Sequence, residues 1–168
     1  MLILFAAGTF DEPTAIVGNM AQNKFDEAHK GVDLNSINQI NQLEEEVKNN
    51  PSDLEKLAQL GHLLNDSGFY ERAIEKYNMY LNIRPNDVDV MVDMGVCYFQ
   101  LKDYTNAIST MEKAVGIDPK HQIGFFNLGV VQLSAGNREK AVEHWKKCIS
   151  LDPNSRIAQR AQELLNNN

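Results

Sequence analysis

Four of the five prolines in the chain recur at a fixed spacing, and this spacing constrains the fold more than any other feature. They lie at Pro51, Pro85, Pro119 and Pro153, each 34 residues from the next, while the fifth is Pro13. A period of this length is typical of repeated helix pairs that stack along one direction. Because proline lacks the backbone N–H that a continuing helix would use, each periodic proline predicts the end of a helix.

Each period contains two apolar patterns with helical spacing. The first places apolar residues and a glycine on one face: Leu57, Leu60, Gly61 and Leu64; Met91, Met94, Gly95 and Tyr98; Phe125, Leu128 and Gly129. The second begins near an alanine and has a large residue four positions later: Ala73 and Tyr77, Ala107 and Met111, Ala141 and Trp145. Since a glycine within a helix costs about 1 kcal/mol relative to alanine, its recurrence at one phase indicates that the two helices approach closely.

These units resemble tetratricopeptide repeats (TPRs), whose pattern is W-x2-L-G-x2-Y, then A-x3-F, then P. The Leu-Gly pair reads Met94-Gly95 in the second unit, and the tyrosine that follows is kept only as Tyr98. Trp145 occupies the phenylalanine slot of the third unit. The resemblance covers residues 52–153 and implies an all-α, right-handed superhelical solenoid of antiparallel helix pairs.

The chain is expected to divide into repeats with a helix on either side. The repeats are assigned to residues 52–85, 86–119 and 120–153. A leading helix is expected within residues 36–51 and a capping helix within residues 154–168, because the last unit of an array otherwise leaves an apolar face open. The capping helix is predicted to begin at Asn154 or Ser155. Its apolar side is formed by Ile157, Ala161, Leu164 and Leu165.

Residues 1–35 do not follow the period and begin with the apolar run Met1–Ala7. Crossing a bilayer takes about 20 apolar residues, and a signal peptide begins with basic residues, the first of which is Lys24. Three interpretations remain: the end of a shortened signal or anchor, an added sequence, or a peptide that docks on the protein. We hypothesise that Met1–Phe10 occupies an apolar groove of its own chain or of a neighbour. The compartment stays open between cytoplasmic and, for an anchor, periplasmic and membrane-tethered.

The first helices of stacked pairs line the inner surface of such solenoids, and two of them here carry a second apolar face. Because surface helices normally show a polar face to water, we expect a groove for a helix or an extended peptide with apolar anchors. Its first third is polar and mildly acidic. The alternative is that packing between neighbouring repeats covers the apolar members. The expected groove residues are Ala58, His62, Asn65, Val92, Val96, Phe99, Ile123, Phe126, Val130 and Leu133.

TPR proteins that bind chaperone C-termini use a two-carboxylate clamp of Lys, Asn and Arg residues in this groove. The matching slots hold Ala58, His62, Asp93, Ile123 and Asn127. Four of the five lack the required chemistry, and Asn127 is polar but not basic. The resemblance therefore does not imply capture of an acidic tail.

Charge and residue spacing exclude several classes of function. The net charge of −7 argues against a DNA, RNA or anionic-membrane partner, which would require basic patches. Cys97 and Cys148 fall in apolar helical patterns and are expected to be buried. The four histidines are scattered without metal-ligand spacing, and no glycine-rich phosphate loop is present. We therefore expect no metal, no cofactor and no catalytic site.

The leading hypothesis is a non-catalytic protein–protein interaction scaffold. The layout of apolar segment, leading helix, three repeats and capping helix is similar to that of bacterial membrane-anchored TPR proteins. Some of these serve cytochrome c maturation, so that resemblance implies an assembly factor as an alternative. A self-oligomerisation module, with Met1–Phe10 as the connector, is a further alternative. An enzyme is less well supported, because nothing places acidic pairs such as Glu44-Glu45 in a dry cleft.

Overall fold

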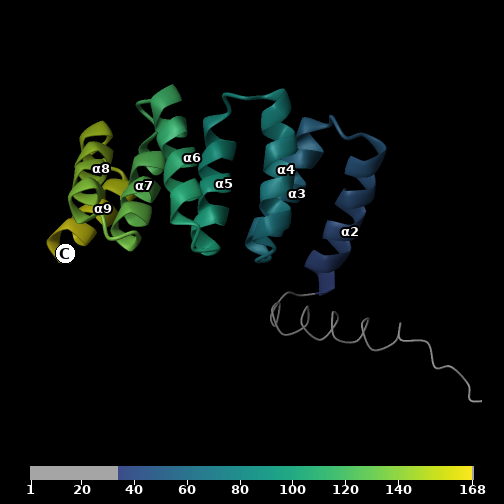
Figure 1. Ribbon diagram of the computed structural model, residues 1–168, viewed down its shortest axis with the longest axis horizontal. Helices are drawn as coiled ribbons and strands as arrows, with labels where there is room; N and C mark the ends of the chain where they lie inside the picture. The colour runs from purple at the N-terminus through teal and green to yellow at the C-terminus, as the bar shows by residue number, and fades with distance from the viewer. Residues whose placement is uncertain (1–33, 168) are drawn as a thin grey trace, which may run out of the picture. The chain divides into compact units, whose positions relative to one another are not determined.

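The computed structural model describes residues 34–167, and all regular structure in this part of the chain is helical (Figure 1). The helices, in order, are α2 (Leu34–Asn49), α3 (Leu54–Asp66), α4 (Tyr70–Ile83), α5 (Val88–Gln100), α6 (Tyr104–Ile117), α7 (Gln122–Ser134), α8 (Arg138–Leu151) and α9 (Arg156–Asn167). The all-α repeat architecture predicted from the proline period is confirmed. Of the helices within residues 34–167, none is both long and apolar enough to cross a membrane.

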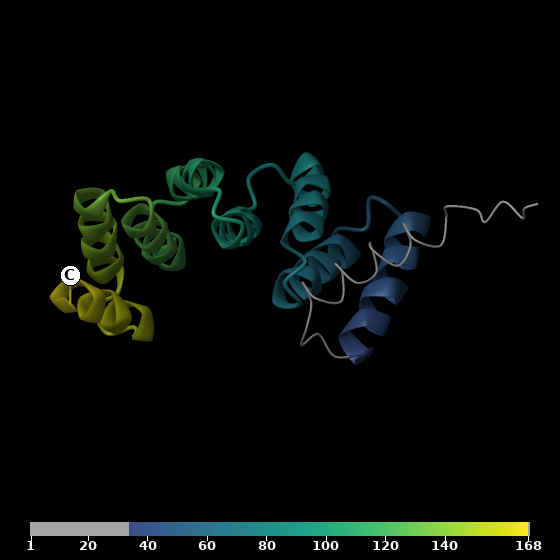
Figure 2. The ribbon, with the colours of Figure 1, turned by 60° about the horizontal axis from the view of Figure 1, so that its bottom comes forward.

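The helices pack as successive pairs: α3 with α4, α5 with α6, and α7 with α8. Each second helix also packs against the first helix of the next pair (Figures 1 and 2). The first helices α3, α5 and α7 contact one another in turn, whereas the second helices α4, α6 and α8 make no such contacts in the described part of the chain. We call the side formed by α3, α5 and α7 the inner layer. Helix α9 extends it, because α9 contacts α7 as well as α8.

Side-chain caps explain where most of the helices begin. An oxygen or ring nitrogen of the residue before the helix accepts a hydrogen bond from a backbone N–H of the first turn, which would otherwise have no partner. The acceptors are Asp53, Asp87 and Asp103 for α3, α5 and α6, His121 for α7 and Ser155 for α9. Ser155 is one of the two residues predicted to begin the capping helix.

The turn inside each pair contains one residue with a positive φ. It is Gly68 (φ 80°) in the first pair and Gly136 (φ 85°) in the third, but Lys102 (φ 61°) in the second. Glycine enters this region without a steric cost because it has no Cβ, whereas the Cβ of other residues makes the region unfavourable. Lys102 therefore holds a strained backbone conformation at a position where the other two repeats use glycine.

The predicted close approach of paired helices is confirmed by the three glycines inside them. A Cβ added to Gly61 would meet the Tyr77 ring, one added to Gly95 would meet Met111, and one added to Gly129 would meet Trp145. The large residues are fully buried against these glycines. Beneath the third repeat, Trp145 Nε1 also donates a 3.2 Å hydrogen bond to the carbonyl of Phe126.

Both cysteines are buried free thiols, as the apolar patterns predicted. Burial raises the pKa of Cys97 to about 12 and that of Cys148 to about 11. A thiolate is therefore strongly disfavoured at either position at neutral pH.

Candidate peptide-binding surface

Some of the predicted groove residues reach the surface of the inner layer, and others are buried. Ile123 is 50 % exposed, and four further apolar side chains are partly buried but reach the surface. We call these five the apolar patch: Val96 and Phe99 of α5 and Ile123, Val130 and Leu133 of α7. Ala58 and Asn65 of α3 are also partly buried, and His62 is exposed.

Two predicted groove residues, Val92 and Phe126, are buried, and Val92 is covered by packing between repeats, which was the alternative interpretation of the apolar face. Val92 is 3 % exposed and packs with Met91 and Ala114. It also lies against Gly124 of α7, whose lack of a side chain lets α5 and α7 approach closely. Val92 is therefore not available to a ligand.

Phe126 is covered from the other side, by the capping helix. It lies in a buried cluster with Trp145 and Ala161, and the guanidinium of Arg160 lies 5.7 Å from the centre of its ring. We remove both Val92 and Phe126 from the proposed contact surface.

Partial packing also positions four of the five members of the apolar patch. Val96 and Phe99 pack against a buried cluster that includes Leu128 and Val131, and the Phe99 ring lies 6.0 Å from that of Tyr104. Val130 and Leu133 pack against the cluster around Trp145. Their buried parts fix these side chains, so a ligand would meet a preformed apolar surface and not a mobile one.

The first part of the inner layer is polar, and its contacts join α3 to α5. His62 Nε2 lies 3.0 Å from Asp93 Oδ2, and the Cys97 thiol donates to Asn65 Oδ1 at 3.3 Å. The His62 ring centre also lies 5.7 Å from that of Tyr77, which comes from α4. Polar side-chain contacts thus connect α3 to α5.

Helix α5 is linked to α7 by a histidine with two partners. His121 Nδ1 accepts from the backbone N–H of Gly124 at 3.0 Å and so caps α7. His121 Nε2 lies 2.8 Å from Asp89 Oδ1. Because Nδ1 accepts from Gly124, Nε2 is the ring nitrogen that is placed to donate to the Asp89 carboxylate.

We call Asp66, Asp89 and Asp93 the acidic patch. Asp89 is 87 % exposed at its side chain and Asp93 is 38 % exposed. Burial raises the pKa of Asp93, and the positive charge available on His62 opposes that effect only in part. The neighbouring carboxylates of Asp89 and Asp66 raise it further.

The contribution of Asp89 and His121 to this surface was not predicted from the sequence. The signal that would have found it is the spacing of the contacts: His62–Asp93, Asn65–Cys97 and Asp89–His121 are all separated by 31 or 32 residues. Neighbouring first helices therefore pair polar residues slightly less than one repeat apart. A search at that spacing, and not at the full repeat length, identifies the pairs.

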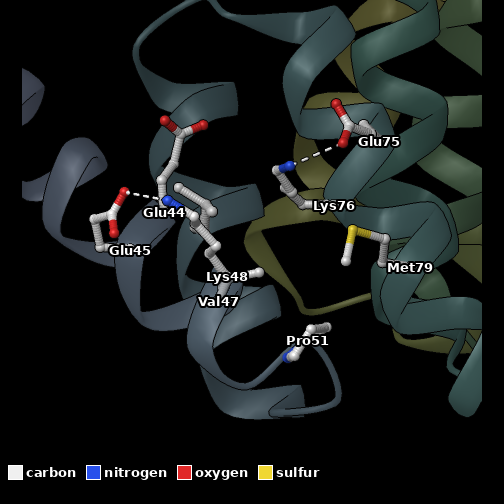
Figure 3. A pocket seen from close by; sticks show the side chains of 9 residues that line it. Glu44, Glu45, Val47, Lys48, Pro51, Glu75, Lys76 and Met79 are labelled. Carbon is white, nitrogen blue, oxygen red and sulfur yellow. Dashed lines mark hydrogen bonds and ion pairs between the residues drawn. The ribbon is translucent and has the colours of Figure 1, made fainter.

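A hollow lies near the start of the described helices, between α2 and α4 (Figure 3). Its volume is about 460 Å³. It is lined by Glu44, Glu45, Val47, Lys48, Pro51, Leu60, Glu75, Lys76 and Met79.

The charged groups of this hollow are already paired with each other or with close neighbours. Lys48 lies 3.4 Å from Glu45, Lys76 lies 2.9 Å from Glu75, and Arg72 lies 2.8 Å from Glu44. A ligand would have to replace these pairs, so the hollow offers less to a charged group than the inner layer does.

Two further expectations from the sequence concern the N-terminal segment and metal ions. The hypothesis for Met1–Phe10 falls on residues outside the described part of the chain. Within residues 34–167, no group of three or more His, Cys, Asp or Glu side chains is placed to hold a metal ion.

Comparisons with known proteins agree with the repeat architecture. Tetratricopeptide-repeat family models match residues 88–121 and residues 123–155. Among solved structures, the chain is similar to MamA with a TM-score of 0.68 and 22 % identity, over 88 % of this chain and 83 % of that one. It is also similar to MamA 41-end from Desulfovibrio magneticus RS-1, with a TM-score of 0.68 and 20 % identity over 73 % and 69 % of the two chains. At these identities the likeness is one of fold. A search of curated proteins gave no match.

Proposed function

The chain belongs to the tetratricopeptide-repeat family of protein-interaction scaffolds, and from this premise we propose that its inner layer binds a peptide or helix of a protein partner without catalysing a reaction. The observation that carries the proposal is the apolar patch on α5 and α7. Exposed apolar surface that is clustered on one face is a common mark of a binding site. The patch lies on the helices that line the inner surface of such arrays.

The size of the apolar patch sets the affinity that we expect. Fully burying one large apolar side chain is worth about 1.5–3 kcal/mol, and the five members of the patch are already partly buried. Their combined contribution is therefore on the order of 5 kcal/mol. Association costs about 4–15 kcal/mol in lost freedom. Binding through this patch alone is expected to be weak, in about the millimolar range or weaker, unless polar contacts add to it.

A pair of matched isoleucines tests the proposal. Ile123 on the inner layer is 50 % exposed, and Ile83 at the end of α4 is 45 % exposed. We would titrate a fluorescein-labelled peptide rich in Leu, Phe and Ala into the full chain, into Ile123→Ser and into Ile83→Ser. Ile123→Ser is expected to weaken binding about five- to tenfold, which corresponds to the loss of one anchor. Ile83→Ser is expected to have no effect.

Two other outcomes would contradict the proposal or indicate a different occupant. Equal weakening by both variants would mean that the peptide adheres to any exposed apolar side chain, and the proposal would be wrong. Sedimentation of the full chain at several concentrations covers a different occupant. Self-association that Ile123→Ser abolishes would show that part of the chain itself occupies the inner layer.

A further inference from the structure

Within residues 34–167, no Lys or Arg forms an ion pair with a carboxylate of the acidic patch. Every Lys or Arg ion pair of residues 34–167 lies elsewhere and involves Glu44, Glu45, Glu46 or Glu75. The partners of Asp89 and Asp93 are histidines: His121 Nε2 lies 2.8 Å from Asp89 Oδ1, and His62 Nε2 lies 3.0 Å from Asp93 Oδ2. Within residues 34–167, Asp89 and Asp93 thus have histidine partners but no Lys or Arg partner.

Two of these carboxylates lie near each other on α5, where both can attract one cationic side chain. Asp89 and Asp93 are four residues apart on α5, and residues at this spacing lie side by side on one helix face, with Cβ atoms about 5–6 Å apart. A cationic side chain that approaches this stretch of α5 would be attracted by both carboxylates. It would also relieve their mutual repulsion, which contributes to the raised pKa of Asp93.

A buried hydroxyl beneath the acidic patch is a second and independent sign of an incomplete polar site. The Tyr77 side chain is fully buried, and its hydroxyl has no hydrogen-bond partner within residues 34–167. Its ring lies against Gly61 and His62, and burial together with the charges of Asp93 and Asp66 raises the Tyr77 pKa. A buried polar group without a partner is costly. The hydroxyl therefore lies in a polar region whose hydrogen bonds are not complete within residues 34–167.

We propose that the acidic patch receives a Lys or Arg side chain of the bound peptide, while apolar residues of the same peptide lie on the apolar patch. The two patches adjoin on α5, where Val96 follows Asp93 by one helical turn. The ligand class is thus a peptide with one basic residue beside apolar ones. This inference rests on the proposed function and adds the residue type that decides which peptides bind.

The experiment compares two probes that differ in charge alone. A fluorescein-labelled peptide of Leu, Phe and Ala with a single Arg is titrated beside the same peptide with citrulline, a neutral isostere, in place of that Arg. Three versions place the residue near the start, the middle or the end, because the direction of binding is open. The best Arg version is expected to bind about tenfold more tightly than its citrulline partner at low salt, as a charge-assisted hydrogen bond would give. The difference should shrink in high salt.

Variants locate the preference. In the full chain, Asp89→Asn with Asp93→Asn is expected to bring the Arg and citrulline peptides to nearly equal affinity, because both changes keep side-chain shape and remove charge. Glu143→Gln, an exposed carboxylate on α8, is the control that changes net charge elsewhere and is expected to keep the tenfold preference. Circular dichroism and urea unfolding of each variant show that the fold is retained.

Each result decides between the two proposals. A doubly substituted chain that keeps the Arg preference overturns the assignment of the acidic patch. Equal binding of Arg and citrulline peptides by the unsubstituted chain overturns it as well, and leaves the apolar binding function standing. A chain that binds none of the peptides contradicts both.

Discussion

The first and third repeats use the same backbone plan with opposite surface chemistry. Beneath the inner layer, Gly61 lies against Tyr77 in the first repeat as Gly129 lies against Trp145 in the third. On the exposed face of the inner layer, Val130 and Leu133 of the third repeat occupy the positions that His62 and Asn65 occupy in the first.

The comparison teaches that stacking and recognition depend on different positions of the repeat. Glycine and its large partner set the distance between paired helices, and so they are similar in all three repeats. The outward positions contribute little to that distance and are free to differ. We expect changes at the first kind of position to alter stability, and changes at the second kind to alter binding.

The largest expected effect breaks the packing in one repeat. Gly129→Ala places a Cβ against the rigid Trp145 ring, next to the hydrogen bond from its Nε1 to Phe126. We predict destabilisation of about 1–3 kcal/mol, because overpacking outweighs the better helix propensity of alanine. Gly95→Ala meets the flexible Met111 instead and should cost less than about 1 kcal/mol. Urea unfolding of both variants measures the difference, and equal losses would contradict this account.

A stabilising change tests an irregularity of the third repeat. The side chain of Gln132 is fully buried, and its Nε2 has no partner in the described structure, although its Oε1 accepts from Asn137. The first repeat has Leu64 at this position. Gln132→Leu removes the unsatisfied group, and Asn137, which is exposed, can bond to water. We predict a gain of about 1 kcal/mol in the free energy of unfolding, and a loss of similar size would show that the amide is satisfied in solution.

The second repeat differs from the other two at its turn. Lys102→Gly is predicted to stabilise the protein by about 0.5–1 kcal/mol, because it removes a left-handed non-glycine residue. Gly136→Ala is the reverse change at the matching turn and should destabilise by about 1 kcal/mol. Thermal unfolding of both variants measures these shifts. A loss of stability in Lys102→Gly would mean that the greater freedom of glycine in the unfolded chain outweighs the relief of strain at this turn.

The smallest expected effect concerns the acidic patch and depends on pH. Because the pKa of Asp93 is raised in the folded chain, protonation of this carboxyl favours folding. That contribution is present at acidic pH and is lost as the pH rises through the folded-state pKa. Asp93→Asn is therefore predicted to unfold at slightly higher urea concentration than the unsubstituted chain at neutral pH, and at nearly the same concentration at acidic pH. The opposite pH trend would mean that His62 more than compensates the carboxylate.

Much of the fold was predictable because its determinants recur along the sequence. The periodic prolines, the glycine phase and the large residues at Tyr77, Met111 and Trp145 describe local helices and their neighbours, and the structure agrees with them. The capping serine was also predictable, since a cap is a local contact.

The surface was less predictable, because burial of an inner-layer residue depends on the next repeat. Val92 and Phe126 have the same helical phase as Ala58, yet α7 covers the first and α9 covers the second. The link between Asp89 and His121 depends on the shift between neighbouring helices, which the proline period alone does not give.

We propose that the inner layer is the binding surface, and that it receives a basic residue of the ligand at the acidic patch and apolar residues of the ligand at the apolar patch. The most direct test is a ¹⁵N NMR titration of the full chain with the Arg-containing apolar peptide. This account predicts that the largest shifts of backbone amides occur around Asp89, Asp93 and Val96 of α5 and around Ile123 and Val130 of α7. Shifts confined to the outer helices, for example around Met79 and Ile83 of α4, would contradict it.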